Sequence, residues 1–205
     1  MFSNFELFGS IINYRIKEEI SQYIYDAGIA HVVRLVFHDC VGGCDGCINR
    51  ANTQNAGTWI GTVDMLDRFY DQFMIRQFMS RADFYQLAGI AAIENGYLNA
   101  NPDDYFGVPV IPFQYGRKDC STSPNTDVEI SFGSGHFDFE KLFAFMKEEF
   151  GMNLRETVAI MGAHTVGGAS GASGFLGFFK GTEKASFKWD AGYYQRLLNK
   201  KLSWT

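Results

Sequence analysis

The sequence lacks several features, and each absence excludes a class of protein. No apolar stretch among its 205 residues approaches the roughly 20 residues that a membrane-spanning helix needs. The N-terminus has no basic region followed by an apolar block, which argues against a signal peptide. Basic runs are absent and the net charge is −5, so nucleic acid is not the expected partner. We therefore expect neither membrane nor nucleic acid binding.

Alternating runs typical of β-strands are also scarce, whereas apolar residues recur at helical spacing along most of the chain. Ser80 is a suitable N-cap for the helix that follows it. No internal repeat or linker divides the chain, so we expect one all-α domain over residues 1–205. The expected helices, separated by a long loop over about 95–134, are 10–27, 30–41, 56–74, 82–94, 137–150, 154–166 and 191–201.

The four cysteines are unevenly distributed: Cys40, Cys44 and Cys47 crowd together, and Cys120 lies far along the chain. Four cysteines permit two disulfides in three possible connectivities. Cys44 and Cys47 also have the spacing of zinc ligands, but no second pair of this kind follows. Disulfides in an oxidising compartment, free thiols and a zinc site therefore all stay open as interpretations.

The segment RLVFHDC, residues 34–40, carries charged and titratable groups in an otherwise apolar helix. Arg34 and His38 are four residues apart, so their side chains point the same way, with Phe37 beside them. An imidazole can move a proton while a guanidinium stabilises developing negative charge, which suits the pair to catalysis. The alternative is a structural histidine next to a surface arginine.

A second histidine, His164, ends the nearly apolar segment AIMGAHTVGG, whose glycines leave room for a flat, bulky group. By itself, such a histidine is more often a core residue than a ligand. Two histidines on separate helices, of which only one has an arginine partner, suggest the two faces of a haem. His164 would bind the iron, and Arg34 with His38 would face the open side.

These segments resemble the plant, fungal and bacterial haem peroxidase superfamily over residues 12–201. The distal, middle and proximal signatures of that family are similar to RLVFHDC, GRKDC and VAIMGAHTVGGA. Three stretches resemble the ascorbate and cytochrome c peroxidases: SRADFYQLAGIAAIE, IPFQYGRKD, and SGFLGFF followed by WDAGYYQRLL. The motif FHDC together with GGCDGC resembles the secreted peroxidases instead. The resemblance implies an all-α haem peroxidase fold with haem b between a distal and a proximal helix.

The resemblance also implies catalytic roles for residues of the distal side. His38 matches the base that moves the proton of hydrogen peroxide, and Arg34 matches the residue that stabilises the departing hydroxide and the ferryl intermediate. Phe37 matches the distal aromatic residue. Asn55 matches the asparagine that holds the distal imidazole in its working tautomer. The alternative interpretation of Asn55 is an N-cap of the third helix, and one residue can have both roles.

On the proximal side, His164 matches the iron ligand, and Phe179 matches the position of the radical-bearing tryptophan of cytochrome c peroxidase, which implies that Phe179 contacts the haem. Ala172 replaces the arginine with which ascorbate enzymes clamp their donor, and His31 replaces an acidic residue of manganese-oxidising enzymes. Small phenolic or aromatic compounds are therefore the expected reducing substrates, by elimination.

Cation sites are implied less directly. Candidate calcium ligands on the distal side are Asp39, Gly43 and Asp45, and candidate ligands of a proximal cation are Thr165 and Asp190. Cys47 and Lys180 replace residues that complete these sites in the family, and a thiol is a poor calcium ligand.

Three further expectations concern the protein as a whole. Family members continue beyond the YYQRLL helix, where they carry the aspartate that binds the proximal imidazole, so we expect a second chain to supply the C-terminal part. The cysteines favour an extracellular location, while the ascorbate-peroxidase-like helices and the absence of N-x-S/T favour an intracellular one. The alternative functions are a catalytically reduced haem-binding structural or storage protein and a sensor that uses its cysteines.

Overall fold

The computed structural model describes residues 4–24, 26–55, 59–135, 137–168 and 187–199. No strand occurs among them, only an isolated bridge between Ile48 and Asn125. The predicted all-α class is therefore confirmed. The elements are α1 (Asn4–Ser21), α2 (Asp26–Cys40), η1 (Thr53–Asn55), η2 (Trp59–Val63), α3 (Asp64–Gln72), η3 (Ile75–Gln77), α4 (Arg81–Ala100), η4 (Tyr105–Gly107), α5 (Phe139–Phe150), α6 (Leu154–Met161), η5 (Gly162–Thr165) and α7 (Gly192–Leu197).

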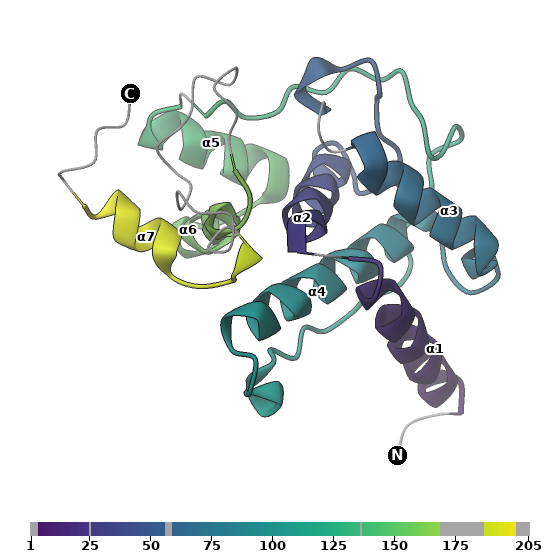
Figure 1. Cartoon of the computed structure of the whole chain (residues 1–205). Coiled ribbons are helices and arrows are strands. Elements are labelled where there is room, and N and C mark those ends of the chain that lie inside the picture. Colours follow the sequence, from purple (N-terminus) through teal and green to yellow (C-terminus); the bar gives the residue numbers. More distant parts are fainter. Residues whose placement is uncertain (1–3, 25, 56–58, 136, 169–186, 200–205) are drawn as a thin grey trace.

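The core is built on the packing of α2 against α4, with α1 and α3 beside them (Figure 1). Val32 and Leu35 of α2 are fully buried there. Gly89 of α4 allows the close approach, because a Cβ atom at this position would lie 2.8 Å from Val36 of α2. This packing fixes α2, which carries Arg34 and His38, in the middle of the molecule.

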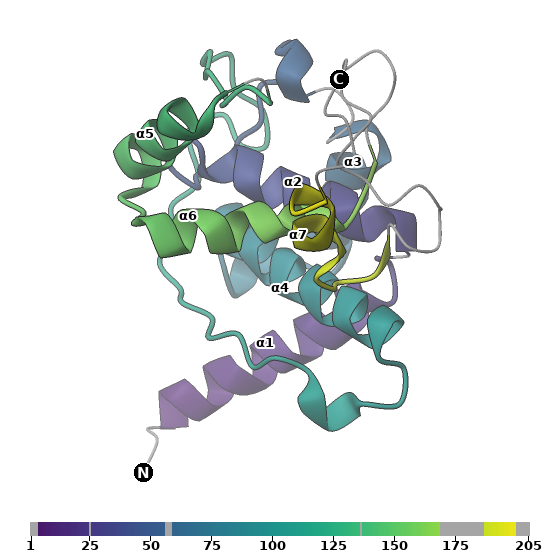
Figure 2. The ribbon, with the colours of Figure 1, turned by 90° about the vertical axis from the view of Figure 1, so that its left-hand side faces the viewer.

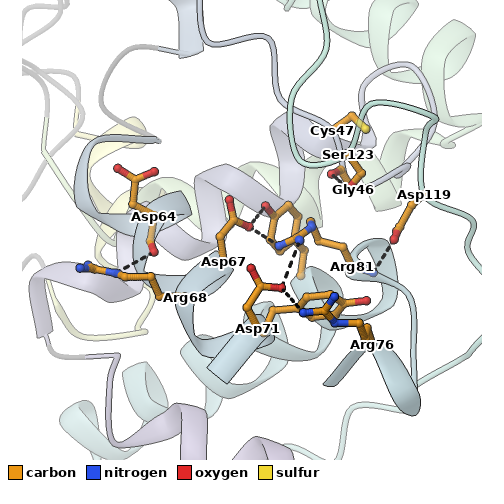
Figure 3. Close-up of polar contacts among 12 residues, drawn as sticks. Gly46, Cys47, Asp64, Asp67, Arg68, Asp71, Arg76, Arg81, Asp119 and Ser123 are labelled. Carbon is orange, nitrogen blue, oxygen red and sulfur yellow. Dashed lines mark hydrogen bonds and ion pairs between the residues drawn. The ribbon is translucent and has the colours of Figure 1, made fainter. Parts of the chain in front are cut away.

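The N-terminus of α4 is held by the polar contacts drawn in Figure 3. Arg81 forms an ion pair of 2.6 Å with Asp67 of α3, and its backbone N–H donates to Asp119. The predicted N-cap is confirmed, since the Ser80 hydroxyl accepts the backbone N–H of Asp83. The helix that supports α2 is thus anchored at its start to α3 and to the segment around Asp119.

All four cysteines are in disulfides, Cys40–Cys44 and Cys47–Cys120. The first closes the loop that follows α2, and the second joins that loop to the long segment before α5. The disulfide prediction is confirmed, and neither free thiols nor a thiolate zinc site remains, because no cysteine sulfur is free.

The second half of the described chain places α5, α6 and α7 on the side of α2 away from α3 (Figures 1 and 2). A capping box of Asn153 and Glu156 starts α6. The predicted helix 154–166 is shorter than expected, because α6 ends at Met161 and a 3₁₀ turn follows. Tyr194 of α7 donates its hydroxyl to the Val158 carbonyl at 2.6 Å, and Gly162 leaves the space that this hydroxyl needs.

Helix boundaries differ from the prediction in the N-terminal part as well. Gly28 was expected to end the first helix, but α1 ends at Ser21 and α2 already begins at Asp26. The long loop begins later than predicted, because α4 continues to Ala100. In the part of the chain that the structure describes, no helix is both long enough and apolar enough to span a bilayer.

Candidate active site

Arg34 and His38 lie on one face of α2, as their spacing predicts. The Arg34 Nε–H donates to His38 Nε2 at 3.3 Å, and a second guanidinium nitrogen donates to the Gln54 carbonyl at 2.9 Å. His38 is only 8% exposed, whereas Arg34 is exposed. A guanidinium is therefore fixed at the imidazole nitrogen that points away from the protein core.

Asn55, in η1, fixes the other nitrogen of the imidazole. Its amide nitrogen donates to the Asn49 carbonyl at 2.8 Å, so its amide oxygen faces His38 Nδ1 at 2.7 Å. Nδ1 must then carry the proton, and the lone pair resides on Nε2. The buried Asn55 thus holds His38 in the tautomer that can accept a proton at Nε2.

The pKa of His38 is lowered to about 4. Burial is the main cause, because desolvation disfavours the imidazolium form, and the positive charge of Arg34 adds to the effect. The hydrogen bond to Asn55 opposes it. His38 is therefore neutral, and able to act as a base, throughout the neutral and mildly acidic range.

This pKa predicts the pH profile of a reaction that uses His38 as its base. The neutral form persists above the lowered pKa, so the rate constant for the reaction with hydrogen peroxide that the sequence resemblance implies should be flat from pH 8 to 5. It should fall to half near pH 4, as the imidazole becomes protonated. Stopped-flow measurement in inert buffers of constant ionic strength tests this. An inflection near the ordinary histidine value of about 6.5 would contradict it.

Two phenylalanines surround the imidazole. Phe37 meets it edge-on, with ring centroids 6.0 Å apart, and packs against Phe150 of α5. Phe132 stacks on it, with centroids 4.1 Å apart and ring planes 27° apart. Phe37 was predicted from the sequence. Phe132 was missed, because it lies in the long loop, where no periodicity or motif marks it.

His164 lies in η5, after the end of α6. Its Nδ1 is 3.0 Å from the Met161 carbonyl, so Nδ1–H donates to this oxygen and the lone pair lies on Nε2. The ring stacks on Tyr193 of α7, with centroids 5.5 Å apart. His164 thus has a fixed tautomer with Nε2 as the nitrogen that a metal could take.

The pKa of His164 is affected by the charge of Arg34, which lies on the distal side. This pKa is lowered by burial first, and the Arg34 charge lowers it further, so the two side chains lie within electrostatic range. Burial also lowers the pKa of Arg34. Both side chains are nevertheless exposed to solvent. An exposed imidazole and an exposed guanidinium that interact electrostatically could face a flat group bound between them. Phe179, Ala172 and Lys180 lie outside the described residues.

The distal carboxylates provide the strongest case for a cation. Asp39 is buried, and one of its oxygens accepts the Cys47 N–H while the other has no hydrogen-bond partner. Its pKa is raised to about 7, mainly by burial and further by the charges of Asp45 and Asp119. An orphaned, buried carboxylate oxygen near a second carboxylate fits a hard cation. The Cys47 sulfur cannot contribute, because it is bonded to Cys120. Calcium at Asp39, Gly43 and Asp45 stays a prediction.

The predicted proximal pair is brought together. The Thr165 hydroxyl lies 2.9 Å from the Asp190 backbone carbonyl and 3.1 Å from its carboxylate, which also accepts the Gly192 N–H. These contacts join η5, which carries His164, to the start of α7. A cation at Thr165 and Asp190 also stays a prediction.

Comparison with known proteins shows which protein family the chain belongs to. A sequence model of the family "Peroxidase" matches residues 13–205, and the chain belongs to this family. The chain is 27% identical to Peroxidase 18 of Arabidopsis thaliana over 186 residues, which cover 84% of the chain and 53% of that relative.

Two further relatives represent other branches of the family. A probable peroxisomal L-ascorbate peroxidase 3 of rice, Oryza sativa subsp. japonica, is 30% identical over 202 residues, or 90% of the chain and 61% of the relative. A mitochondrial cytochrome c peroxidase of Candida albicans is 32% identical over 119 residues, or 56% of the chain and 27% of the relative. The chain therefore spans about half to three fifths of the length of the first two relatives.

Proposed function

We propose that this protein is a haem-dependent peroxidase that uses hydrogen peroxide to oxidise small donor molecules, within one domain. The observation that carries the proposal is the hydrogen-bonded set Arg34–His38–Asn55, with His164 within electrostatic range of its arginine. A proton acceptor and a fixed cation on one helix, with an imidazole that could bind the iron on another segment, are the groups that peroxide cleavage at a haem requires.

Haem b, when bound, supplies the redox chemistry: a two-electron oxidation by peroxide and two one-electron reductions by donors. His164 would hold the iron through Nε2, since Nδ1–H is engaged by the Met161 carbonyl. Phe37, beside His38 and packed on α5, would form part of the distal wall. Phe179 is proposed to contact the haem from the sequence alone.

His38 Nε2 would accept one proton from hydrogen peroxide and return it to the oxygen that leaves as water when the O–O bond breaks. Arg34 must move its N–H from His38 Nε2 to the departing oxygen, where its charge stabilises the negative charge that develops. The Asn55 amide oxygen accepts a hydrogen bond from Nδ1–H throughout and so keeps the basic lone pair on Nε2. Two donors would then each supply one electron and one proton, so that the overall change is one peroxide, two electrons and two protons to two waters.

Small phenolic or aromatic molecules are the proposed donors. His31 is exposed on α2, at the position where manganese-oxidising enzymes place an acid, and an imidazole is a weaker match than a carboxylate for manganese.

Two disulfides favour an oxidising, extracellular compartment over an intracellular one. A second chain stays a prediction, and a native mass equal to the 23.1 kDa of the single chain would contradict it.

One observation favours the alternative of a haem-binding structural or storage protein with reduced catalysis. The acceptor of the His164 Nδ1 proton is a neutral backbone carbonyl in the described part of the chain. A carboxylate in this position makes an imidazole ligand more basic, whereas a carbonyl does so less. The reaction with peroxide separates the two functions, because only turnover requires a fast one.

The proposal is tested by titrating the purified protein with haem and recording the Soret band before and after stoichiometric peroxide. We expect one haem per chain and a rapid decrease in Soret absorbance. His164→Ala should weaken haem binding at least about tenfold, with partial rescue by added imidazole. His31→Ala is the matched control and should bind haem like the wild type. Slow bleaching would support the storage protein, and no Soret band would refute haem binding.

A further inference from the structure

Among the residues that the structure describes, the closest aromatic contact of His38 comes from a residue far from it in sequence. Phe132 precedes α5 in the long loop, is 8% exposed, and lies nearly parallel to the imidazole at a centroid distance of 4.1 Å. We propose that Phe132 is a positioning residue for His38: its ring fixes the plane of the imidazole and excludes water from one face. This inference rests on the proposed role of His38 as the base.

The segment that carries Phe132 is tied to the segment that carries Asn55. The Asn49 amide donates to the Val128 carbonyl at 3.1 Å, and the Asn52 amide donates to the Ile130 carbonyl at 3.0 Å. The same two amides donate to the two carboxylate oxygens of Glu129, each at 3.3 Å. These four bonds form a ladder between residues 49–52 and residues 128–130.

Closer to the site, the ladder continues through Gln54. The Phe132 N–H donates to the Gln54 side-chain oxygen at 3.4 Å, and the Gln54 carbonyl accepts a guanidinium N–H from Arg34. The chain therefore holds Phe132, Arg34 and the Asn55 amide in one hydrogen-bonded frame. These hydrogen bonds therefore hold the Phe132 ring in its stacked position on His38.

The stacked ring supplies a restraint that the hydrogen bond lacks. The imidazole is bonded at Nδ1 to Asn55 and at Nε2 to Arg34, but Arg34 must leave Nε2 when peroxide reacts, and the ring can then tilt about its bond to Asn55. A parallel phenyl ring removes this freedom, so Nε2 keeps one direction. Reaction rates depend steeply on such alignment, since a misplacement of about 1 Å can cost about 100-fold.

The ring also explains part of the burial of His38. Arg34, on α2, is the charged group that acts on His38, and η1 presents the neutral Asn55. The segment that bears Phe132 contributes Glu129, whose carboxylate is occupied by Asn49 and Asn52. An apolar cover on one face disfavours the imidazolium form, in agreement with the lowered pKa of His38.

Three variants test the proposal. Phe132→Ala removes the ring, Phe132→Leu keeps an apolar cover without a flat face, and Phe132→Tyr keeps the face. Phe139→Ala is the control, because Phe139 is an exposed α5 residue that stacks on Phe143 instead. Two quantities are measured: the pKa of His38 by NMR titration of the haem-free protein, and the rate constant for peroxide in the haem-loaded protein. The missing signal of His38→Ala assigns the resonance.

We expect Phe132→Ala to raise the His38 pKa by about one unit and to slow the peroxide reaction about 10- to 100-fold. Phe132→Leu should keep the low pKa but lose most of the rate, and Phe132→Tyr should restore both to within about twofold of the wild-type rate. If Phe132→Ala fails to fold, the rate of Phe132→Leu decides the matter.

Wild-type values of both quantities in Phe132→Ala, or a wild-type rate in Phe132→Leu, would overturn the proposal while the peroxidase function stands. A wild-type protein that does not react with peroxide would instead refute the proposed function. In that case the NMR titration still decides whether Phe132 covers His38: an unchanged pKa in Phe132→Ala overturns the inference, and a raised one supports it.

Discussion

Replacing His38 by alanine is expected to lower the rate constant for reaction with hydrogen peroxide by about 10²- to 10⁴-fold, the range that general acid–base catalysis supplies. His38 is the buried base whose Nε2 carries the lone pair, because its Nδ1–H donates a hydrogen bond to the Asn55 amide oxygen. Without it, the proton of peroxide must pass to water, and Arg34 can stabilise charge but cannot accept a proton.

The measurement is stopped-flow recording of the Soret band after peroxide is mixed with haem-loaded protein at pH 7. Haem affinity should change little, because His164, not His38, is proposed to hold the iron. His31→Ala is a suitable control, since His31 lies on the same helix but is exposed. A loss of less than about threefold in His38→Ala would mean that another group is the base, and it would contradict the role proposed for His38.

Whether the sequence could predict each contact of the site depends on how far apart the two residues lie along the chain. Arg34 and His38 are one helical turn apart, so helix geometry alone placed them on one face. Asn55 followed from the motif it shares with the family, although its anchor, the Asn49 carbonyl, carries no side-chain signal. Phe132 approaches His38 from a distant loop, and such a contact depends on tertiary structure that local patterns do not encode.

The helices show the same limit. Ser80 was identified as an N-cap because its hydroxyl needs only the backbone three residues ahead. Gly28 was misjudged as a helix end, since a glycine is tolerated in the first turn of α2, which is supported by packing on α4. The proximal helix was drawn too long because its apolar pattern continues through Val166, while the close approach of Tyr194 accompanies a tighter turn at Gly162.

The disulfide Cys47–Cys120 is expected to stabilise the fold by about 4 kcal/mol, because it closes a loop with a sequence separation of 73 residues. In the chain-entropy account, a crosslink restricts the unfolded chain more as the loop grows. The bond Cys40–Cys44, with a separation of 4, should contribute only about 2 kcal/mol by the same relation. The larger value is a substantial part of the 5–15 kcal/mol typical of folded domains.

Two double variants make the comparison: Cys47→Ser with Cys120→Ser, and Cys40→Ser with Cys44→Ser. Urea unfolding at 25 °C, followed by far-ultraviolet circular dichroism, gives the free energy of unfolding of each and of the wild type. The first variant should lose about twice as much as the second. Equal losses, or a larger loss for the short loop, would contradict the loop-length argument. The short bond would then act mainly through the folded state, where it closes the turn that follows Asp39 at the end of the helix that carries His38.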